Sequence, residues 1–134
     1  MASVDRILGR HRESPPDARL SNADFVAGLR IGEEAAEIAI AAREILATKS
    51  RLYPEQVTPD LSMLWLFGRM STALTEGFEP MDFTFELERR FGRKIRLSYQ
   101  DFPQRRDITV HEWFNIVIPR LCSEILGKHD EELT

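Results

Sequence analysis

The side chains that most often catalyse reactions are few in this sequence, and they do not form a recognisable set. Its three histidines, His11, His111 and His129, lie far apart, and none has a partner at the spacing of a metal site. His111 falls in the first turn of an expected helix, where a solvated side chain is a simpler interpretation than a general base. The pattern therefore predicts no metal centre.

A lone cysteine and a pair of carboxylates could also carry chemistry. Cys122 could act as a nucleophile only with a base and an oxyanion pocket, and no motif supplies either, so a small half-buried apolar side chain is favoured. Asp82 and Glu86 are four residues apart on one helical face, but a catalytic pair would need a cleft that separates their pKa values. We expect a solvated helix surface there. For the whole protein, a small enzyme that acts through Cys122 or His111 is an alternative function.

Composition restricts the class of protein. The chain has 134 residues, of which 43% are hydrophobic, and this is enough for about one domain with one core. The net charge is −4 and the basic residues are spread out, so no basic face for nucleic acid is expected. No apolar run approaches the roughly 20 residues that span a bilayer, and the N-terminus has no apolar stretch of secretory type. The single cysteine excludes an internal disulfide, and we expect a soluble cytoplasmic protein without membrane contact.

Capping residues and apolar spacing divide the chain into a helical domain, 21–128, and two segments expected to be mobile, 1–20 and 129–134. Ser21 and Asp24 form a capping box that predicts a short helix. We expect that helix to run through Leu29. A longer helix follows from about residue 33 to residue 48, because apolar residues recur there every three or four positions.

The second half of the domain also has only helical patterns. Thr58 and Pro59 predict a helix start, and the stretch LSMLWLFG predicts a short buried helix that ends at Gly68. A helix is expected from Pro80 to Phe91, stopped by Gly92. Thr109 and Glu112 form a capping box for the last helix, which Pro119 should kink or split. The residues of that helix expected to face inward are Val110, Trp113, Phe114, Val117 and Ile118.

The helix that ends at Phe91 has Leu87 and Glu88 in its last turns and is followed by Gly92 and Ile95, and the last helix begins with Thr109 and Val110. With these residues, the order of the elements resembles that of the acyl and peptidyl carrier proteins. In that family a helix ends in Leu-Glu-x-x-Phe-Gly-x-x-Ile, and a Thr-Val step begins the last helix. The resemblance covers about residues 43–118 and implies an all-α, acyl-carrier-protein-like four-helix bundle. Here the bundle would have an extra N-terminal helix and an enlarged loop before its second helix. The matching residues are Leu87, Glu88, Phe91, Gly92, Ile95, Thr109 and Val110.

The resemblance also implies a cofactor position, and this sequence departs from it. Carrier proteins bear 4′-phosphopantetheine on a serine at the start of the second helix. Counting back from Phe91 places that serine at Gly77, which has no hydroxyl. Counting forward from Val57 reaches Ser71 instead, which lacks the usual preceding acid and following leucine. We expect no cofactor, with a genuine carrier modified at Ser71 as the alternative.

A carrier-like domain without its arm would act as a protein-interaction or regulatory module, and no enzyme activity is expected. In the family the second helix docks on partner proteins through an acidic surface, whereas here that helix turns basic toward its C-terminal end. A tryptophan in the enlarged loop could anchor a partner as well. The expected partner-binding residues are Trp65, Glu79, Asp82, Glu86, Arg89 and Arg90.

Overall fold

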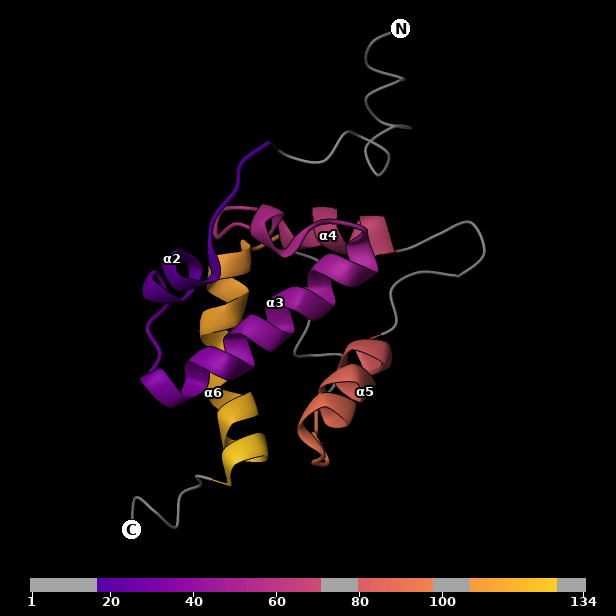
Figure 1. Cartoon of the computed structure of the whole chain (residues 1–134). Helices are drawn as coiled ribbons and strands as arrows, with labels where there is room; N and C mark the ends of the chain where they lie inside the picture. The colour runs from indigo at the N-terminus through magenta and orange to yellow at the C-terminus, as the bar shows by residue number, and fades with distance from the viewer. Residues whose placement is uncertain (1–16, 71–79, 98–106, 128–134) are drawn as a thin grey trace, which may run out of the picture.

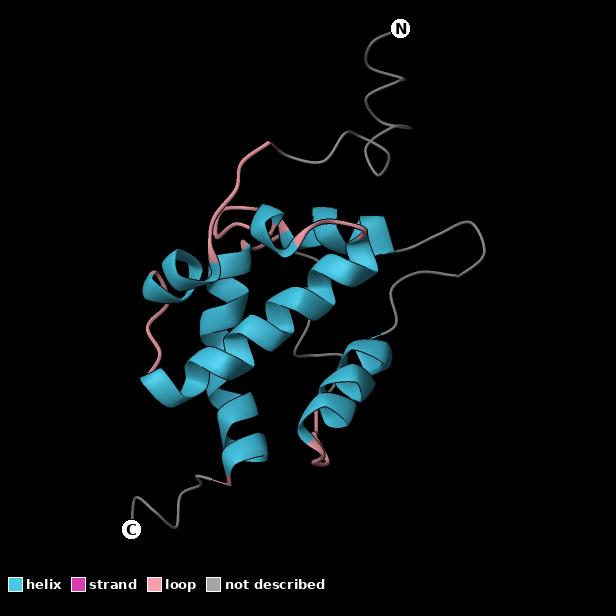
Figure 2. Cartoon of the chain, in the orientation of Figure 1, coloured by secondary structure: helices cyan, strands magenta, loops and turns pink. Residues whose placement is uncertain are grey.

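The computed structural model describes residues 17–70, 80–97 and 107–127. All regular structure in these ranges is helical apart from one isolated bridge between Ser62 and Thr109 (Figure 2), which confirms the predicted all-α class. The elements are α2 (Asn22–Ala27), η2 (Glu33–Ala35), α3 (Ala36–Ser50), η3 (Pro54–Gln56), α4 (Met63–Met70), α5 (Pro80–Phe91) and α6 (Val110–Leu126), where η marks a 3₁₀ turn.

Helix α3 is the central element of the described structure. It packs against α2, α4, α5 and α6, and in Figure 1 it runs diagonally across α6 with α2 on one side and α5 on the other. Its buried residues include Ile38, Ala42 and Ile45, which recur every three or four positions as the apolar spacing predicts. Each of the other α-helices therefore contacts α3.

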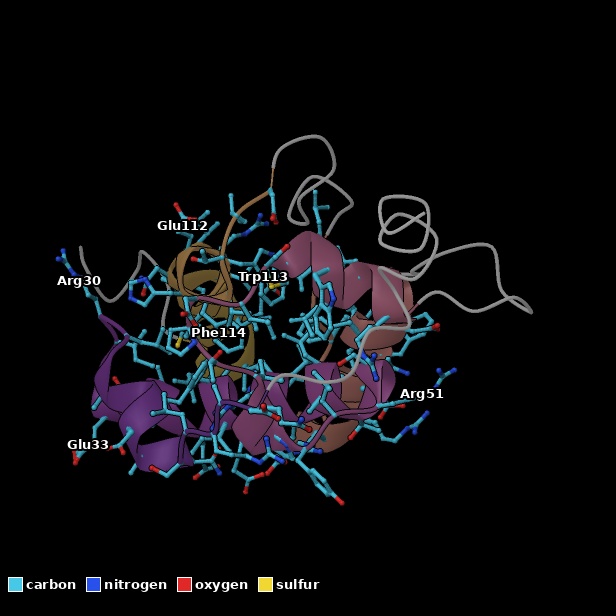
Figure 3. The ribbon with its side chains drawn as sticks, turned by 90° about the horizontal axis from the view of Figure 1, so that it is seen from above. Arg30, Glu33, Arg51, Glu112, Trp113 and Phe114 are labelled. Atoms are coloured by element: carbon cyan, nitrogen blue, oxygen red, sulfur yellow. The ribbon has the colours of Figure 1, made fainter. Side chains whose placement is uncertain are left out.

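A chain of aromatic rings connects three of these helices through the core. Phe25 of α2 meets Phe114 of α6 with ring centroids 5.1 Å apart. Phe114 lies 5.5 Å from Trp113, which in turn lies 5.5 Å from Phe83 of α5. All three contacts are edge-to-face, the geometry that aromatic quadrupoles favour. Figure 3 shows Trp113 and Phe114 directed inward, and all five residues predicted to face inward from α6 are buried.

The predicted helix starts at Ser21 and Thr109 are confirmed. The Ser21 hydroxyl accepts from the Asp24 amide at 3.1 Å. The Thr109 hydroxyl accepts from the Glu112 amide at 3.1 Å, while the Glu112 carboxylate accepts from the Thr109 amide at 2.9 Å. Each contact satisfies an amide that has no partner within its own helix, so the caps fix where α2 and α6 begin.

The expected helix start at Thr58 and Pro59 is wrong. Thr58 instead forms a turn, in which its hydroxyl donates to the Asp60 carboxylate at 3.1 Å, and α4 begins only at Met63. The Met63 amide donates to the Ile108 carbonyl oxygen at 2.9 Å, so the start of α4 is set by a segment distant in sequence. This long-range contact outweighs the local proline signal.

Two expected helix breaks are also absent. Helix α4 continues past Gly68 to Met70, and α6 is continuous through Pro119, so the predicted split is wrong. Pro119 lies on the exposed side of α6, while Ile118 and Leu121 on either side of it are completely buried. Burial of both turns against the core offsets the hydrogen bond that proline removes.

Candidate interaction surface

The solvent side of α5 carries four residues at helical spacing, and we call them the α5 face: Asp82, Phe85, Glu86 and Arg89. Positions separated by three, four and seven residues lie on one side of a helix. Phe85 is 50% exposed, and the Arg89 side chain is 76% exposed. Among the described residues, none forms a hydrogen bond or ion pair with the Asp82 carboxylate. The α5 face is therefore a charged surface with an aromatic ring at its centre.

The opposite side of α5 fixes the helix to the rest of the molecule. Phe83 and Leu87 are completely buried, and Phe83 packs on Trp113. Arg90 forms an ion pair with Glu44 of α3 at 2.5 Å. This ion pair joins α5 to α3. The predicted partner-binding role of Arg90 stays a prediction.

A tight turn follows α5 and holds the end of the helix in place. Gly92 has a φ of +66°, a conformation that glycine adopts at little cost. The Glu88 carboxylate accepts a hydrogen bond from the Ile95 amide at 2.9 Å, and Ile95 is buried. Glu88, Gly92 and Ile95 thus form one local unit, in which the returning chain is tied to the last turn of α5.

Trp65 does not belong to the α5 face. It lies in α4 rather than in an open loop, is partly buried against the core, and has the Arg69 guanidinium 5.3 Å from its ring centroid. The Arg69 Nε donates to the Ser50 carbonyl oxygen at the end of α3, at 2.8 Å. Burial lowers the pKa of Arg69, and nearby Arg51 acts in the same direction. Trp65 therefore contributes to the packing of α4 on α3.

A serine and an aspartate lie together at the start of α4 and resemble a catalytic pair, but they cap the helix. The Ser62 hydroxyl donates to Asp107 at 2.6 Å and accepts from the Trp65 amide at 3.0 Å. The other Asp107 oxygen accepts from the Leu64 amide at 3.2 Å. These contacts satisfy the first amides of α4, where negative charge is also favoured by the helix dipole.

Arg43 is completely buried and is not among the predicted site residues. Its Nε donates to the Val57 carbonyl oxygen at 3.0 Å, Nη1 to the Asn22 side chain at 2.9 Å and Nη2 to the Leu20 carbonyl oxygen at 2.7 Å. The guanidinium carbon lies 4.3 Å from the centroid of the Phe25 ring. The available signal was its position, since residue 43 falls between buried Ala39 and Leu46 on α3.

Burial of Arg43 has an electrostatic consequence. Removal of the guanidinium from water lowers its pKa below the usual range, and the Glu55 carboxylate partly offsets this change. The charge is compensated mainly by neutral oxygens and an aromatic face rather than by a hydrogen-bonded carboxylate. Arg43 therefore joins the N-terminal segment and the loop after α3 to the core, and we assign it a structural role.

The two alternative catalytic residues, His111 and Cys122, both lie on α6. His111 Nε2 donates to the Gly28 carbonyl oxygen at 3.0 Å, and Asn115, one turn later, accepts from the Arg30 amide at 3.3 Å. Both side chains hold the segment after α2 against α6. Cys122 is partly buried; burial raises the pKa of its thiol, and the Glu34 carboxylate raises it further. A raised pKa disfavours the reactive thiolate.

Several predicted positions lie outside the described residues, namely Ser71, Gly77 and Glu79.

Within the described ranges, no three His, Cys, Asp or Glu side chains are grouped as a metal ion would require. A hollow of about 410 Å³ lies beside Glu33 and Glu34 and is widely open to solvent. None of the described helices combines the length and apolar character needed to cross a bilayer. The α5 face remains the strongest candidate site.

Comparisons with known proteins give no relative from which a role could be transferred. No family model, curated protein or solved structure matches the chain. A function can therefore be inferred only from the α5 face and from the residues that hold it.

Proposed function

We propose that this protein is an atypical carrier-like domain that binds a protein partner through the α5 face and has no phosphopantetheine arm. The observation that carries the proposal is Phe85, a half-exposed aromatic ring between acidic and basic side chains on a firmly packed helix. Aromatic residues flanked by charges are common anchors of protein interfaces. This role requires binding and no catalytic residue.

The local geometry after α5 supports the carrier-like part of the proposal. Leu87 and Ile95 are buried, Glu88 joins the helix to the returning chain, and Gly92 makes the turn. With Phe91 partly buried against the core, these features give each residue of the Leu-Glu-x-x-Phe-Gly-x-x-Ile pattern a structural purpose. A pattern of mostly core positions supports a fold more strongly than an activity.

The missing arm can be tested by mass. The intact protein should keep its unmodified mass after incubation with a phosphopantetheinyl transferase and coenzyme A, because Gly77 offers no hydroxyl for attachment. A known carrier protein in the same reaction is the positive control. Added mass that disappears in Ser71→Ala would establish the alternative, a genuine carrier modified at Ser71, and would overturn this part of the proposal.

The enzyme alternative predicts a reactive thiol, whereas the surroundings of Cys122 predict an unreactive one. Because its thiol pKa is raised, the native protein should react with a chromogenic disulfide reagent at neutral pH more slowly than the urea-unfolded protein. The difference between the two labelling rates should narrow as the pH rises and the native thiol ionises. Labelling of native Cys122 faster than of the unfolded chain would support a catalytic cysteine instead.

A further inference from the structure

The charges of the α5 face change sign along the helix axis. Asp82 and Glu86 occupy its first part, Arg89 occupies its last part, and Phe85 lies between Asp82 and Arg89. A surface with one sign of charge would repel a copy of itself. A surface whose sign reverses along its length is complementary to an antiparallel copy, because each acidic end then meets a basic end.

We infer that the α5 face binds the α5 face of a second copy of this chain, with the two helices antiparallel about a twofold axis. The inference rests on the proposed docking role of α5 and names its partner. With the axis between positions 85 and 86, Asp82 of one protomer faces Arg89 of the other, and the symmetry repeats this pair. The same register places position 85 of each protomer opposite position 86 of the other, so the two Phe85 rings lie next to the axis between the two ion pairs, and each Glu86 keeps its contact with Arg89 of its own helix.

The monomer leaves these groups available for such a contact. No described residue pairs with the Asp82 carboxylate, and Phe85 is half exposed. Arg89 contacts Glu86 within the same helix at 3.4 Å, a pair with 76% and 37% exposed side chains. An arginine has five N–H donors, so Arg89 can keep this contact and still bind a carboxylate on a partner.

The size of the surface sets the strength of the association. Helix α5 has 12 residues and is therefore roughly 18 Å long, so a pair of such helices buries less area than a stable dimer interface. Exposed ion pairs add little each, while the two aromatic rings add apolar contact. We expect a reversible dimer with a dissociation constant on the order of 100 μM.

Sedimentation velocity of the full chain tests this directly. The wild-type protein should shift from monomer to dimer between about 10 μM and 1 mM. Asp82→Arg makes the face mostly basic and Arg89→Asp makes it acidic, so each variant alone should associate at least about tenfold more weakly. An equimolar mixture of the two variants should restore the dimer, because both pairs between positions 82 and 89 then have opposite charges.

Matched controls separate this effect from a general change in charge or folding. Asp17→Arg and Arg30→Asp make the same charge changes at exposed positions outside α5, and both should dimerise as the wild type does. Circular dichroism of each variant checks that the helices are intact. Phe85→Ala keeps every charge and should also weaken the dimer, which tests the inference even if a charge reversal disturbs α5.

A wild-type protein that stays monomeric to about 1 mM would overturn the inference, as would two folded variants that fail to associate when mixed. Neither result depends on phosphopantetheine. If the protein stays monomeric and keeps its mass in the transferase reaction, the inference that α5 binds a second copy is wrong. The proposal of a carrier-like domain without an arm would still hold. If the protein gains mass and dimerises as expected, the proposal that it has no arm is wrong and the inferred dimer would still hold.

Discussion

Arg43 and Arg89 have the same side chain but opposite surroundings. Arg43 is completely buried and binds three oxygens that belong to the chain's own N-terminal segment and loop. Arg89 has a side chain that is 76% exposed, and its sequence neighbour Glu86 supplies the one carboxylate that pairs with it among the described residues. The polar contacts of Arg43 build the fold, whereas the charges of the α5 face lie on the surface. The partner that we propose could therefore bind the α5 face without any change in the core.

The largest expected effect comes from Arg43→Ala. The substitution leaves three oxygens without their donor and opens a cavity next to Phe25, so the free energy of unfolding should fall by about 3–5 kcal/mol. Urea denaturation followed by circular dichroism measures this. Arg89→Ala is the matched control and should change stability by less than about 0.5 kcal/mol. Equal losses for the two variants would contradict the contrast between the two regions.

Two phenylalanines two positions apart sharpen the comparison within α5 itself. Phe83 is completely buried against Trp113, and Phe83→Ala should destabilise the protein by about 3–5 kcal/mol. Phe85 is half exposed, and Phe85→Ala should cost less than about 1 kcal/mol. Thermal unfolding of both variants gives the difference, with the milder Phe83→Leu as a substitute if Phe83→Ala does not fold. A large loss from Phe85→Ala would mean that this ring belongs to the core.

A smaller effect is expected from the turn after α5. Glu88→Ala removes the acceptor of the Ile95 amide and should destabilise the protein by about 1–2 kcal/mol. Hydrogen exchange should accelerate at the Ile95 amide before the amides of α3 respond, because the damage is local. Glu86 lies on the α5 face and does not bond to the turn, so Glu86→Ala is the control. It should leave hydrogen exchange at the Ile95 amide unchanged. Uniform acceleration across the chain would show that Glu88 has a wider role.

Local signals determined much of the helical structure. The caps at Ser21 and Thr109 and the glycine stop at Gly92 depend on hydrogen bonds and backbone angles within a few residues, so the sequence alone predicts them. The Pro80–Phe91 helix has the predicted bounds for the same reason. The carrier-like topology and the partner role stay proposals, since a helical pattern alone does not identify them.

Long-range contacts decided what local signals could not. The start of α4 depends on Ile108, and the burial of Arg43 depends on Leu20 and Val57, which approach it only when the chain has folded. The exposure of Phe85 beside buried Phe83 likewise follows from which side of α5 meets Trp113. Sequence spacing could place the charged residues of α5 on one side of a helix. Only tertiary packing, which removes one side of that helix from water, determined that Phe85 joins them on the surface.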